Sequence, residues 1–556
     1  LKLINNELSN FVWILNGNIN MKIKYMFIAG CLLLTSACSD FLDHPLTTSV
    51  SDDNIGEIIQ RNPTKLGEFL GSAYRSLGSI HLYGRQTEYM ATMSHEMDID
   101  WLGEEQRNQW AINGLTSTNK NVEEAYIKYY KALASTNLTL DLIDHIDLEA
   151  LDEEKKTMVM NFQGESLFLR AFIHFDLLRL FGEQGPSFGG TYPNNKDAKG
   201  IILREGVADA SNAITARSTI EECYQLIIKD LKKAETCIGD NQIPVNTTIP
   251  GPGYTDTDYT KDQGWAQRPA VHALLGKVYL YMSDFTNAKI EFEKVIGDNR
   301  FKLDKPVNFT DYIQHTDNNP ECIFSLQYYL SSGSAYEDAP QHHLVRIFGG
   351  APGAWNNYFV DQRTAARFGN DPRLNEATLY GYNVKKWSTA TTKPEFEQVN
   401  TSDPTYRYYQ RKYIDFYNVS SPVFSTKNVD IIRLADIYLM YAEVMLKLNS
   451  ADVATEYVNK VRRRAWGESN YDVPGTKGED FTTVTMEILQ EERYKELFFE
   501  NTRWYDICRW GILEQELAKY PSTNAGTVHY DPQDYYLPIP ESEMRSNPLM
   551  KQSKGY

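Results

Sequence analysis

One spacing of residues occurs twice in this chain, and it restricts the fold more than any other feature. Both copies step by 3, 9, 4 and 3 residues, at Gly276, Tyr279, Ala288, Phe292 and Val295 and again at Ala442, Met445, Ala454, Val458 and Val461. Small residues at the first and third positions let two helices approach closely, and the larger residues fill the groove between them. This is the pattern of a tetratricopeptide-like helix pair. Because such pairs bury a core only by stacking, we predict a helical scaffold whose functional segments are inserted between helices.

The composition is that of a large, acidic, globular protein. The chain has 556 residues, of which 42% are hydrophobic and 23% are charged, enough for a substantial core in two or three lobes. Its formal net charge is -18. Because nucleic-acid backbones require a basic protein surface, this charge argues against a nucleic-acid partner.

The N-terminal region has the pattern of an export signal. Residues 1–20 fit nothing downstream, so we expect them to be upstream translation outside the native protein, which would start at Met21. Two lysines follow Met21, and then ten apolar residues occupy 25–34. A helix that spans a bilayer needs about 20 such residues. We therefore predict a cleaved signal peptide over 21–37.

The end of this signal indicates lipid attachment. Thr35-Ser36-Ala37 places small residues directly before Cys38, as at a lipoprotein cleavage site, so we predict that Cys38 is acylated. Ordinary cleavage that leaves a spare cysteine is the alternative. Residues 38–53 are polar and lack an apolar period, which is typical of a tether between a lipid and a folded body.

The remaining cysteines and the acidic loops predict neither a metal site nor a cofactor. Four cysteines lie in the body of the chain, at Cys223, Cys237, Cys322 and Cys508. They are too few for a disulfide scaffold and show no Cys/His metal spacing, so we expect buried free thiols. Asp256, Asp258 and Asp262 offer oxygen ligands but lack the spacing of a calcium loop.

Apolar residues recur with a helical period in five further segments. These are 54–77, 122–146, 161–181, 218–236 and 486–510. The fourth would begin at a capping box of Ser218 and Glu221. His174, in the third, lies on the apolar side of the pattern, which favours a core histidine over a ligand.

Two segments imitate catalytic motifs. Residues 185–189 read Gly-Pro-Ser-Phe-Gly, but a nucleophilic serine of this kind must follow a strand and open a helix, whereas a helix is expected before this one. The segment 486–510 is dense in Glu, Asp and Arg. Paired carboxylates suit acid/base catalysis, yet Glu and Arg at helical spacing more often form ion pairs. We predict no catalytic residue.

Two segments rich in aromatic and planar polar side chains are candidates for ligand contact. The first lacks a helical period over 80–119 and carries Asp98, Trp101, Asn108, Gln109 and Trp110. The second lies in a long insertion of about 300–429 and carries Tyr336, Trp355 and Tyr358. Rings that stack and amides that hydrogen-bond suit a sugar. The alternative is that the tryptophans pack inside a capping loop, since most tryptophans are largely buried.

A set of short words also occurs in a fixed order along the chain. The words are Gly164-Glu165-Ser166-Leu167-Phe168-Leu169-Arg170-Ala171-Phe172, Ile432-Arg433-Leu434-Ala435-Asp436, Tyr441-Ala442-Glu443, Asn459-Lys460-Val461-Arg462, Glu492-Arg493, Glu496-Leu497, Phe499-Glu500, Arg503-Trp504-Tyr505-Asp506, Arg509-Trp510-Gly511, Pro538-Ile539-Pro540 and Asn547-Pro548. In this order they resemble the SusD/RagB-like nutrient-binding outer-membrane lipoprotein family. Residues 267–270, before the first helix pair, depart from the family's usual Gly-Arg-Ala, which concerns helix entry and not binding.

The resemblance implies a mainly α fold, with four tetratricopeptide-like helix pairs as scaffold and a large, irregular, loop-rich insertion carrying short strands. It implies an N-terminal SusD-like region over 54–270 and a C-terminal RagB/SusD-like region over 271–556. It also implies an oligosaccharide ligand, a SusC-like TonB-dependent transporter as partner, and a lipid anchor on the extracellular face of the outer membrane. The two aromatic segments correspond by position to the family's binding regions.

We therefore predict a non-enzymatic lipoprotein that binds a glycan and delivers it to the transporter. Three alternatives stay open. They are a surface glycosidase using a carboxylate pair such as Asp98 and Glu104, a peptide-binding lid of the same family, and a structural lid whose transporter does all the recognition.

Overall fold

The structure is a computed structural model that describes residues 52–99, 105–209, 211–239, 264–303, 320–327, 358–360, 362–374, 378–380, 382–386, 395–398, 408–410, 412–413, 428–477, 480–519 and 530–556. The chain divides into two compact units, 1–61 and 62–556. The described part of the first unit contains α4 (Asp52–Arg61). All other elements below belong to the second unit. The predicted signal peptide and Cys38 lie outside the described residues, as do the three aspartates considered for a cation.

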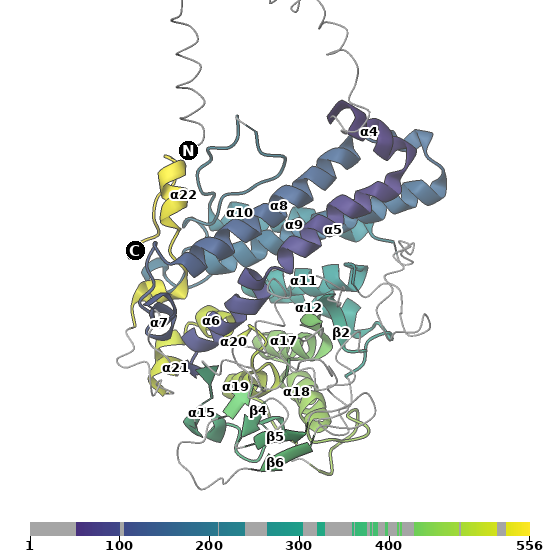
Figure 1. The fold of residues 1–556 in the computed structure, drawn as a ribbon. Helices are drawn as coiled ribbons and strands as arrows, with labels where there is room; N and C mark the ends of the chain where they lie inside the picture. Colours follow the sequence, from purple (N-terminus) through teal and green to yellow (C-terminus); the bar gives the residue numbers. More distant parts are fainter. Residues whose placement is uncertain are drawn as a thin grey trace, which may run out of the picture. The chain divides into compact units, whose positions relative to one another are not determined.

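Long helices lying side by side form the N-terminal part of the second unit (Figure 1). They are α5 (Leu66–Leu77), α8 (Lys120–Asp144), α9 (Glu153–Phe181) and α10 (Ile220–Cys237). α8 packs against α5 and α9, and α9 packs against α10. Side-chain caps set their starts: the Asn119 side chain accepts from backbone N–H groups at the start of α8, and the Asp152 side chain does so for α9.

Two helix starts differ from the prediction. The capping box joins Thr219 and Glu222, one residue later than expected, because the backbone of Ser218 bonds instead to Gly200 and Ile201. α9 begins at Glu153, eight residues before the predicted start at 161. Its first two turns are charged and solvated, so they show no apolar period.

Several predictions about single residues are confirmed. His174 is fully buried, its Nε2 accepts from the Arg204 backbone N–H at 3.2 Å, and burial lowers its pKa to about 3. It is a neutral core histidine. The four cysteines of the body are buried and unpaired with one another. Residues 186–188 form a short 3-10 turn closed by backbone hydrogen bonds between Gly185 and Gly190, which is not the strand-turn-helix of a nucleophilic serine.

The repeated spacing forms two helical hairpins, as predicted. The first is α11 (Arg268–Tyr281) with α12 (Phe285–Ile296), and the second is α17 (Leu434–Lys447) with α18 (Ala451–Ala465). The hairpins stack, because α12 packs on α17. Their turns contain Ser283 at φ 60° and Asn449 at φ 58°, which occupy the same position of the repeat. The two hairpins therefore share the turn as well as the packing residues.

Among the described residues, short two-stranded sheets are formed by strands of the insertion with one another, with residues 98–99 and with the segment directly before α17. The pairs are β1 (Asp98–Ile99) with β3 (Tyr358–Phe359), β2 (Cys322–Leu326) with β8 (Val429–Arg433), β4 (Thr378–Tyr380) with β7 (Tyr408–Gln410), and β5 (Tyr382–Lys386) with β6 (Glu395–Gln398). A mainly helical scaffold with short strands in its insertion is the predicted fold class, which is confirmed. Within the described residues, no helix is long and apolar enough to cross a membrane.

Two predicted segments were wrong in secondary structure. The segment 80–119 is not aperiodic loop: it contains a π-helical turn (Ile80–Gly84), α6 (Arg85–Met93) and α7 (Glu105–Ala111). Because α6 is buried almost all around, its sequence shows no amphipathic period. The expected single helix over 486–510 is two helices.

The charged segment divides into α19 (Met486–Glu496) and α20 (Arg503–Arg509). The break between them contains Phe499 and Asn501 at φ 66° and 55°. Phe498 and Phe499 are buried in an apolar cluster. Burying both rings there favours a break that a continuous helix would not allow.

The close approach within the first hairpin can be tested at Gly276. A Cβ added at Gly276 would lie 2.5 Å from the Phe292 ring, whereas a Cβ at Gly71 in α5 would meet nothing within 4 Å. We expect Gly276→Ala to lower the free energy of unfolding by about 1–3 kcal/mol because of overpacking. The control Gly71→Ala should raise it by about 0.5–1 kcal/mol. Urea unfolding followed by circular dichroism measures both, and equal effects would contradict the proposed packing.

Candidate functional site

The two aromatic segments predicted separately meet in one antiparallel ladder. Asp98 pairs with Phe359 and Ile99 pairs with Tyr358 in the β1–β3 sheet. Trp101 follows Ile99 by two residues, and Trp355 precedes Tyr358 by three. Trp101, Tyr336 and Trp355 themselves lie outside the described residues. The pairing makes one candidate site out of two, which no local pattern in the sequence indicated.

An apolar cluster lies beneath this ladder. Its members come from α6, β1, α7, β3, α15 (Gln362–Ala366), α19 and the break before α20, and they are Ala91, Met97, Ile99, Ala111, Tyr358, Val360, Ala365, Phe368, Tyr494, Phe498 and Phe499. The ladder is therefore held by residues from both ends of the chain. A rigid base of this kind keeps attached side chains in place.

Three of the predicted ligand residues are buried in the structure. Asp98 is 4% exposed, and its Oδ1 accepts from the backbone N–H of Ile99 at 2.8 Å. Tyr358 is 1% exposed. Trp110 is 2% exposed and stacks on Tyr89, with centroids 4.5 Å apart and 12° between the planes. In this conformation the Trp110 ring is used for packing, which is the alternative to ligand contact that the sequence left open.

The two predicted amides are half-buried on α7. Gln109 Oε1 accepts from the Asn119 side chain at 2.8 Å. Asn108 Oδ1 has no hydrogen-bond partner, and neither has Trp110 Nε1 nor either amide atom of Asn113, although all four atoms are buried. A buried polar atom without a partner costs roughly 1–3 kcal/mol, so a concentration of them in one short segment is a functional signal.

Asn113 was not among the predicted ligand residues. It lies just after α7 at φ 54° and is 5% exposed. The sequence carries one local signal for it, because Asn113-Gly114 is a turn dipeptide. That signal predicts the backbone conformation only. The lack of partners for its amide follows from the tertiary packing around it.

A buried polar group ties α7 to β3. Glu88 on α6 is fully buried, and Arg107 Nε on α7 lies 3.6 Å from its Oε1. Burial, and next the Glu88 charge, raise the pKa of Tyr358 well above its usual range. The Glu88 carboxylate therefore contacts α7, which carries Asn108, and its charge also raises the pKa of Tyr358 in β3.

The turn that leads into β1 contains a carboxyl group that titrates near neutrality. Burial raises the pKa of Glu96 to about 7, against the opposing effects of the Arg503 charge and of hydrogen bonds from the Phe499 N–H and Ser94. The Phe499 N–H donates to Glu96 Oε1 at 3.4 Å. The Glu96 carboxyl therefore links the start of the ladder to the break between α19 and α20.

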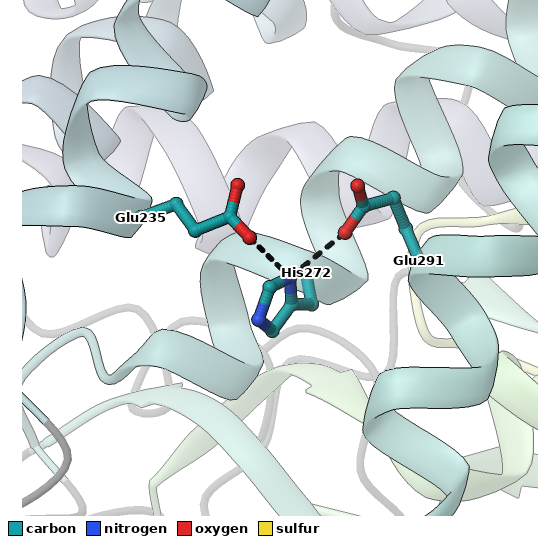
Figure 2. Close-up of side chains that lie close together, drawn as sticks. All are labelled: Glu235, His272 and Glu291. Atoms are coloured by element: carbon teal, nitrogen blue, oxygen red, sulfur yellow. Dashed lines mark hydrogen bonds and ion pairs between the residues drawn. The ribbon is translucent and has the colours of Figure 1, made fainter.

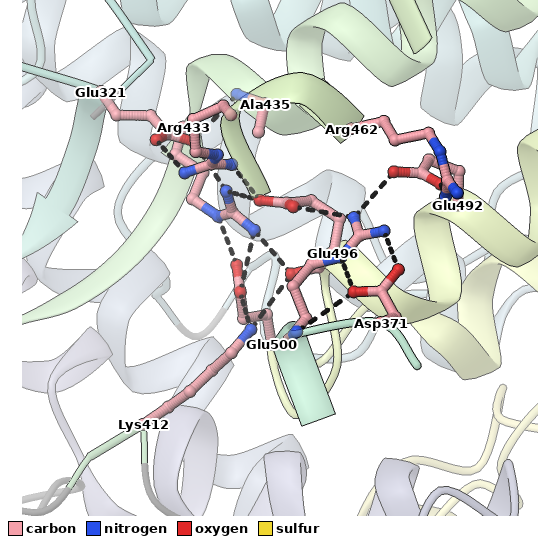
Figure 3. Close-up of polar contacts among 11 residues, drawn as sticks. Glu321, Asp371, Lys412, Arg433, Ala435, Arg462, Glu492, Glu496 and Glu500 are labelled. Carbon is pink, nitrogen blue, oxygen red and sulfur yellow. Dashed lines mark hydrogen bonds and ion pairs between the residues drawn. The ribbon is translucent and has the colours of Figure 1, made fainter. Parts of the chain in front are cut away.

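A buried charge network lies where the insertion meets the second hairpin (Figure 3). It contains the cations Arg373, Lys412, Arg433, Arg462 and Arg464 and the anions Glu321, Asp371, Glu492, Glu496 and Glu500. Arg433 Nη1 lies 2.7 Å from Glu321 and 2.8 Å from Glu496, and Arg373 lies 3.1 Å from Glu496. Five positive charges match five negative ones. Burial by itself would raise the pKa of Glu496. The charges of Arg464, Arg433 and Arg373 outweigh burial and hold this pKa well below its usual range.

A second set of ion pairs joins the two hairpins to the C-terminal helices. Arg493 contacts Asp436 at 2.9 Å and Asp506 at 2.8 Å, and Lys277 of the first hairpin lies 3.5 Å from Asp436. Burial raises the pKa of Asp436, but Lys277 and Arg493 lower it, to about 2. The prediction that the charged segment forms ion pairs is confirmed. Arg493 pairs with other elements, whereas Arg509 pairs with Asp506 at 3.0 Å within α20.

One group of possible metal ligands was also not predicted from the sequence. Glu235 on α10, His272 on α11 and Glu291 on α12 each place a donor atom within 4.8 Å of the other two. Lys232 and Lys294 contact the two carboxylates. Burial raises the pKa of Glu291, but hydrogen bonds from His272, Lys232 and Lys294 lower it, to about 2. The three donors are far apart in sequence and follow no ligand spacing.

These features define a class: a stacked helical-hairpin protein in which two segments between the helices meet in one short buried ladder. Comparison with known sequences gives the family. Residues 320–556 match the SusD family, and residues 40–249 match the family described as "Starch-binding associating with outer membrane". The chain belongs to the SusD family, as the resemblance indicated.

Whole-length relatives agree with this assignment. SusD-like protein P2 of Formosa agariphila is 25% identical over 96% of this chain and 100% of its own, and SusD-like protein P25 of the same organism is 23% identical over 96% and 98%. A SusD superfamily structure from Bacteroides vulgatus has a TM-score of 0.65 at 23% identity, covering 89% of this chain and all of that one. The structure named "Laminarin binding SusD-like protein" has a TM-score of 0.63 at 20% identity, covering 89% and 99%. At these identities the structures establish the shared fold alone.

Glu96 predicts how stability changes with pH. Its pKa is about 7 in the folded state and about 4.3 in an unfolded chain. Between these values the folded state binds more protons, so the free energy of unfolding should fall as pH rises from about 4.5 to 7. Glu96→Gln should remove up to about 3 kcal/mol of this decline. Denaturant unfolding of both proteins at several pH values measures the slope, and an unchanged slope in the variant would contradict the assignment.

The charge network can be tested at its central carboxylate. Glu496→Gln leaves three buried arginines without a full counter-charge, so we expect a loss of about 3–5 kcal/mol in the free energy of unfolding. The control is Glu68→Gln, which removes the exposed Lys65–Glu68 pair and should change stability by less than about 1 kcal/mol. A similar loss in the free energy of unfolding for both variants would show that the buried network is no more stabilising than an exposed ion pair.

Proposed function

We propose that this protein is a cell-surface lipoprotein that binds an oligosaccharide and hands it to a SusC-like TonB-dependent transporter, without chemistry of its own. The observation that carries the proposal is the β1–β3 pairing, which joins the two aromatic segments into one candidate surface. Membership in the SusD family supports a glycan ligand, as do the words "Starch-binding" in one matching family and "Laminarin binding" for one structure of the same fold.

The location rests on two independent signals. The description "associating with outer membrane" belongs to the family matched by residues 40–249 and supports association with that membrane. The sequence before Cys38 supports a lipid anchor there. The resemblance to the family supports the extracellular face and the transporter partner.

We assign different roles to the predicted ligand residues. Trp101 and Trp355, with Tyr336, would present rings to the faces of sugar units. Asn108 and Gln109, together with Asn113, which was not among the predicted residues, would exchange hydrogen bonds with hydroxyl groups, which both donate and accept. Asp98, Trp110 and Tyr358 would support the surface from beneath, since their side chains are buried.

The buried polar atoms without partners near the end of α7 support ligand contacts on the α7 side of the β1–β3 ladder. Asn108 offers a free acceptor, and Asn113 offers both a free acceptor and free donors. A bound hydroxyl group would satisfy these atoms and recover part of their burial cost. Small rearrangements of side chains on binding are common in such sites.

The expected result is glycan binding that depends on the Asn113 amide. Calorimetry of the purified chain with a panel including starch and laminarin oligosaccharides should give binding to at least one glycan. Asn113→Gly should weaken it by about tenfold or more, with stability unchanged or higher because the lost amide has no partner. Asn449→Gly is a matched control, since Asn449 has nearly the same φ and lies in an exposed turn of the second hairpin.

Other outcomes identify the alternatives. Tight binding of peptides with no binding of any glycan would overturn the sugar assignment. Shortened oligosaccharides after long incubation would favour a glycosidase. If Asn113→Gly binds glycans as tightly as the wild type, the residues at the end of α7 do not contact the ligand. Normal binding and uptake by Trp101→Ala and Trp355→Ala would point to a structural lid.

A further inference from the structure

Three helices present one nitrogen and two oxygen ligands to a common point (Figure 2). His272 Nδ1 lies 2.8 Å from Glu291 Oε2 and 3.8 Å from Glu235 Oε1. All three donors are within 4.8 Å of one another. The imidazole is held between the two carboxylates, which approach it from α10 and α12. This position is remote in sequence from the ladder and takes no part in the function proposed above.

The spacing suits a small tetrahedral ion. Zinc bonds to nitrogen and to carboxylate oxygen are about 2.0–2.1 Å long, so two ligands of a tetrahedral zinc ion lie about 3.3 Å apart. The observed 2.8 Å and 3.8 Å fall on either side of that value. The three donors lie within 4.8 Å of one another, so rotation of the two flexible glutamate side chains would be needed to bring them to this spacing.

The charges around Glu235, His272 and Glu291 would allow a divalent ion to replace two lysine ammonium groups. Lys232 lies 2.7 Å from Glu291, and Lys294 lies 3.0 Å from both Glu291 and Glu235. The lysine side chains are 42% and 38% exposed, so their ammonium groups can move into water. Two ammonium charges would leave and one divalent ion would enter, so the net charge of the site would stay the same.

We propose that Glu235, His272 and Glu291 form a site for a divalent transition-metal ion of the zinc class, in competition with Lys232 and Lys294. His272 Nδ1 lies at hydrogen-bond distance from the Glu291 carboxylate and donates to it, so binding would require this proton to move to Nε2, which leaves the Nδ1 lone pair for the ion. One nitrogen and two carboxylates favour zinc over calcium, which prefers six to eight oxygen ligands. The bound ion would link α10 to both helices of the first hairpin.

Calorimetry with zinc chloride on the chelator-treated chain tests this site. We expect one zinc ion per chain and no heat with calcium chloride. His272→Gln should weaken zinc binding by more than about tenfold, and Glu235→Gln, which spares the His272–Glu291 contact, should also weaken it. The double variant Lys232→Met with Lys294→Met should bind zinc more tightly, by about tenfold, because both competing charges are removed.

The lysine variant separates a metal site from a purely structural ion-pair group. His145→Gln is the control for adventitious zinc binding, because His145 is an exposed histidine whose side chain is 70% exposed, and it should bind like the wild type. No zinc binding by the wild type would overturn the proposal, as would equal binding by His272→Gln. So would zinc binding that the double lysine variant weakens. None of these outcomes depends on whether the chain binds glycans.

Discussion

The buried charge network around Glu496 is the interaction on which the rest of the structure depends. Isolated charges cannot be buried without a large free-energy cost, so each guanidinium must meet carboxylates at hydrogen-bond distance. Arg373 comes from the insertion, Arg433 from β8, Arg464 from α18 and Glu496 from α19. Their pairing is satisfied only when these four segments are all in place. The network therefore specifies how an irregular insertion docks on a regular stack of helices.

The candidate site follows from that docking. β3 lies a few residues before Arg367, whose guanidinium contacts Glu491 of α19 and packs over the Tyr494 ring at 3.9 Å. Tyr494 belongs to the same apolar cluster as Tyr358 and Ile99. The ion pair that fixes Arg367 on α19 therefore also helps to fix the position of the β1–β3 ladder, through the cluster that contains Tyr494. The scaffold supplies rigidity, and the segments attached to it supply the polar atoms that lack partners.

Buried ion pairs, in this network and in the second set that joins the hairpins to the C-terminal helices, explain why the family is recognisable from sequence while the ligand is not. Many words that carry the resemblance contain ion-paired residues, among them Arg433, Asp436, Glu443, Arg493 and Arg509. A buried charge allows few substitutions, because its partner would be left uncompensated. The half-buried amides of Asn108 and Gln109 on α7 follow no such rule, since they can be replaced without leaving a buried charge uncompensated.

Local patterns in the sequence determined the helical hairpins, the buried thiols, the core histidine at position 174 and the ionic character of 486–510. Each was signalled by residues within a few turns of one another, where helical periodicity is visible, although the partners of the charges in 486–510 were not, since Arg493 pairs with Asp436 and Arg509 with Glu443. Tertiary structure alone decided the break at Phe499, the burial of α6 on all sides, the pairing of Asp98 with Phe359, the unpartnered amide of Asn113 and the meeting of Glu235, His272 and Glu291. These features depend on contacts between distant segments, whose free energies no local spacing encodes. A helix ends where two rings find a better place in the core, and a carboxylate becomes a ligand only when another helix brings a histidine beside it.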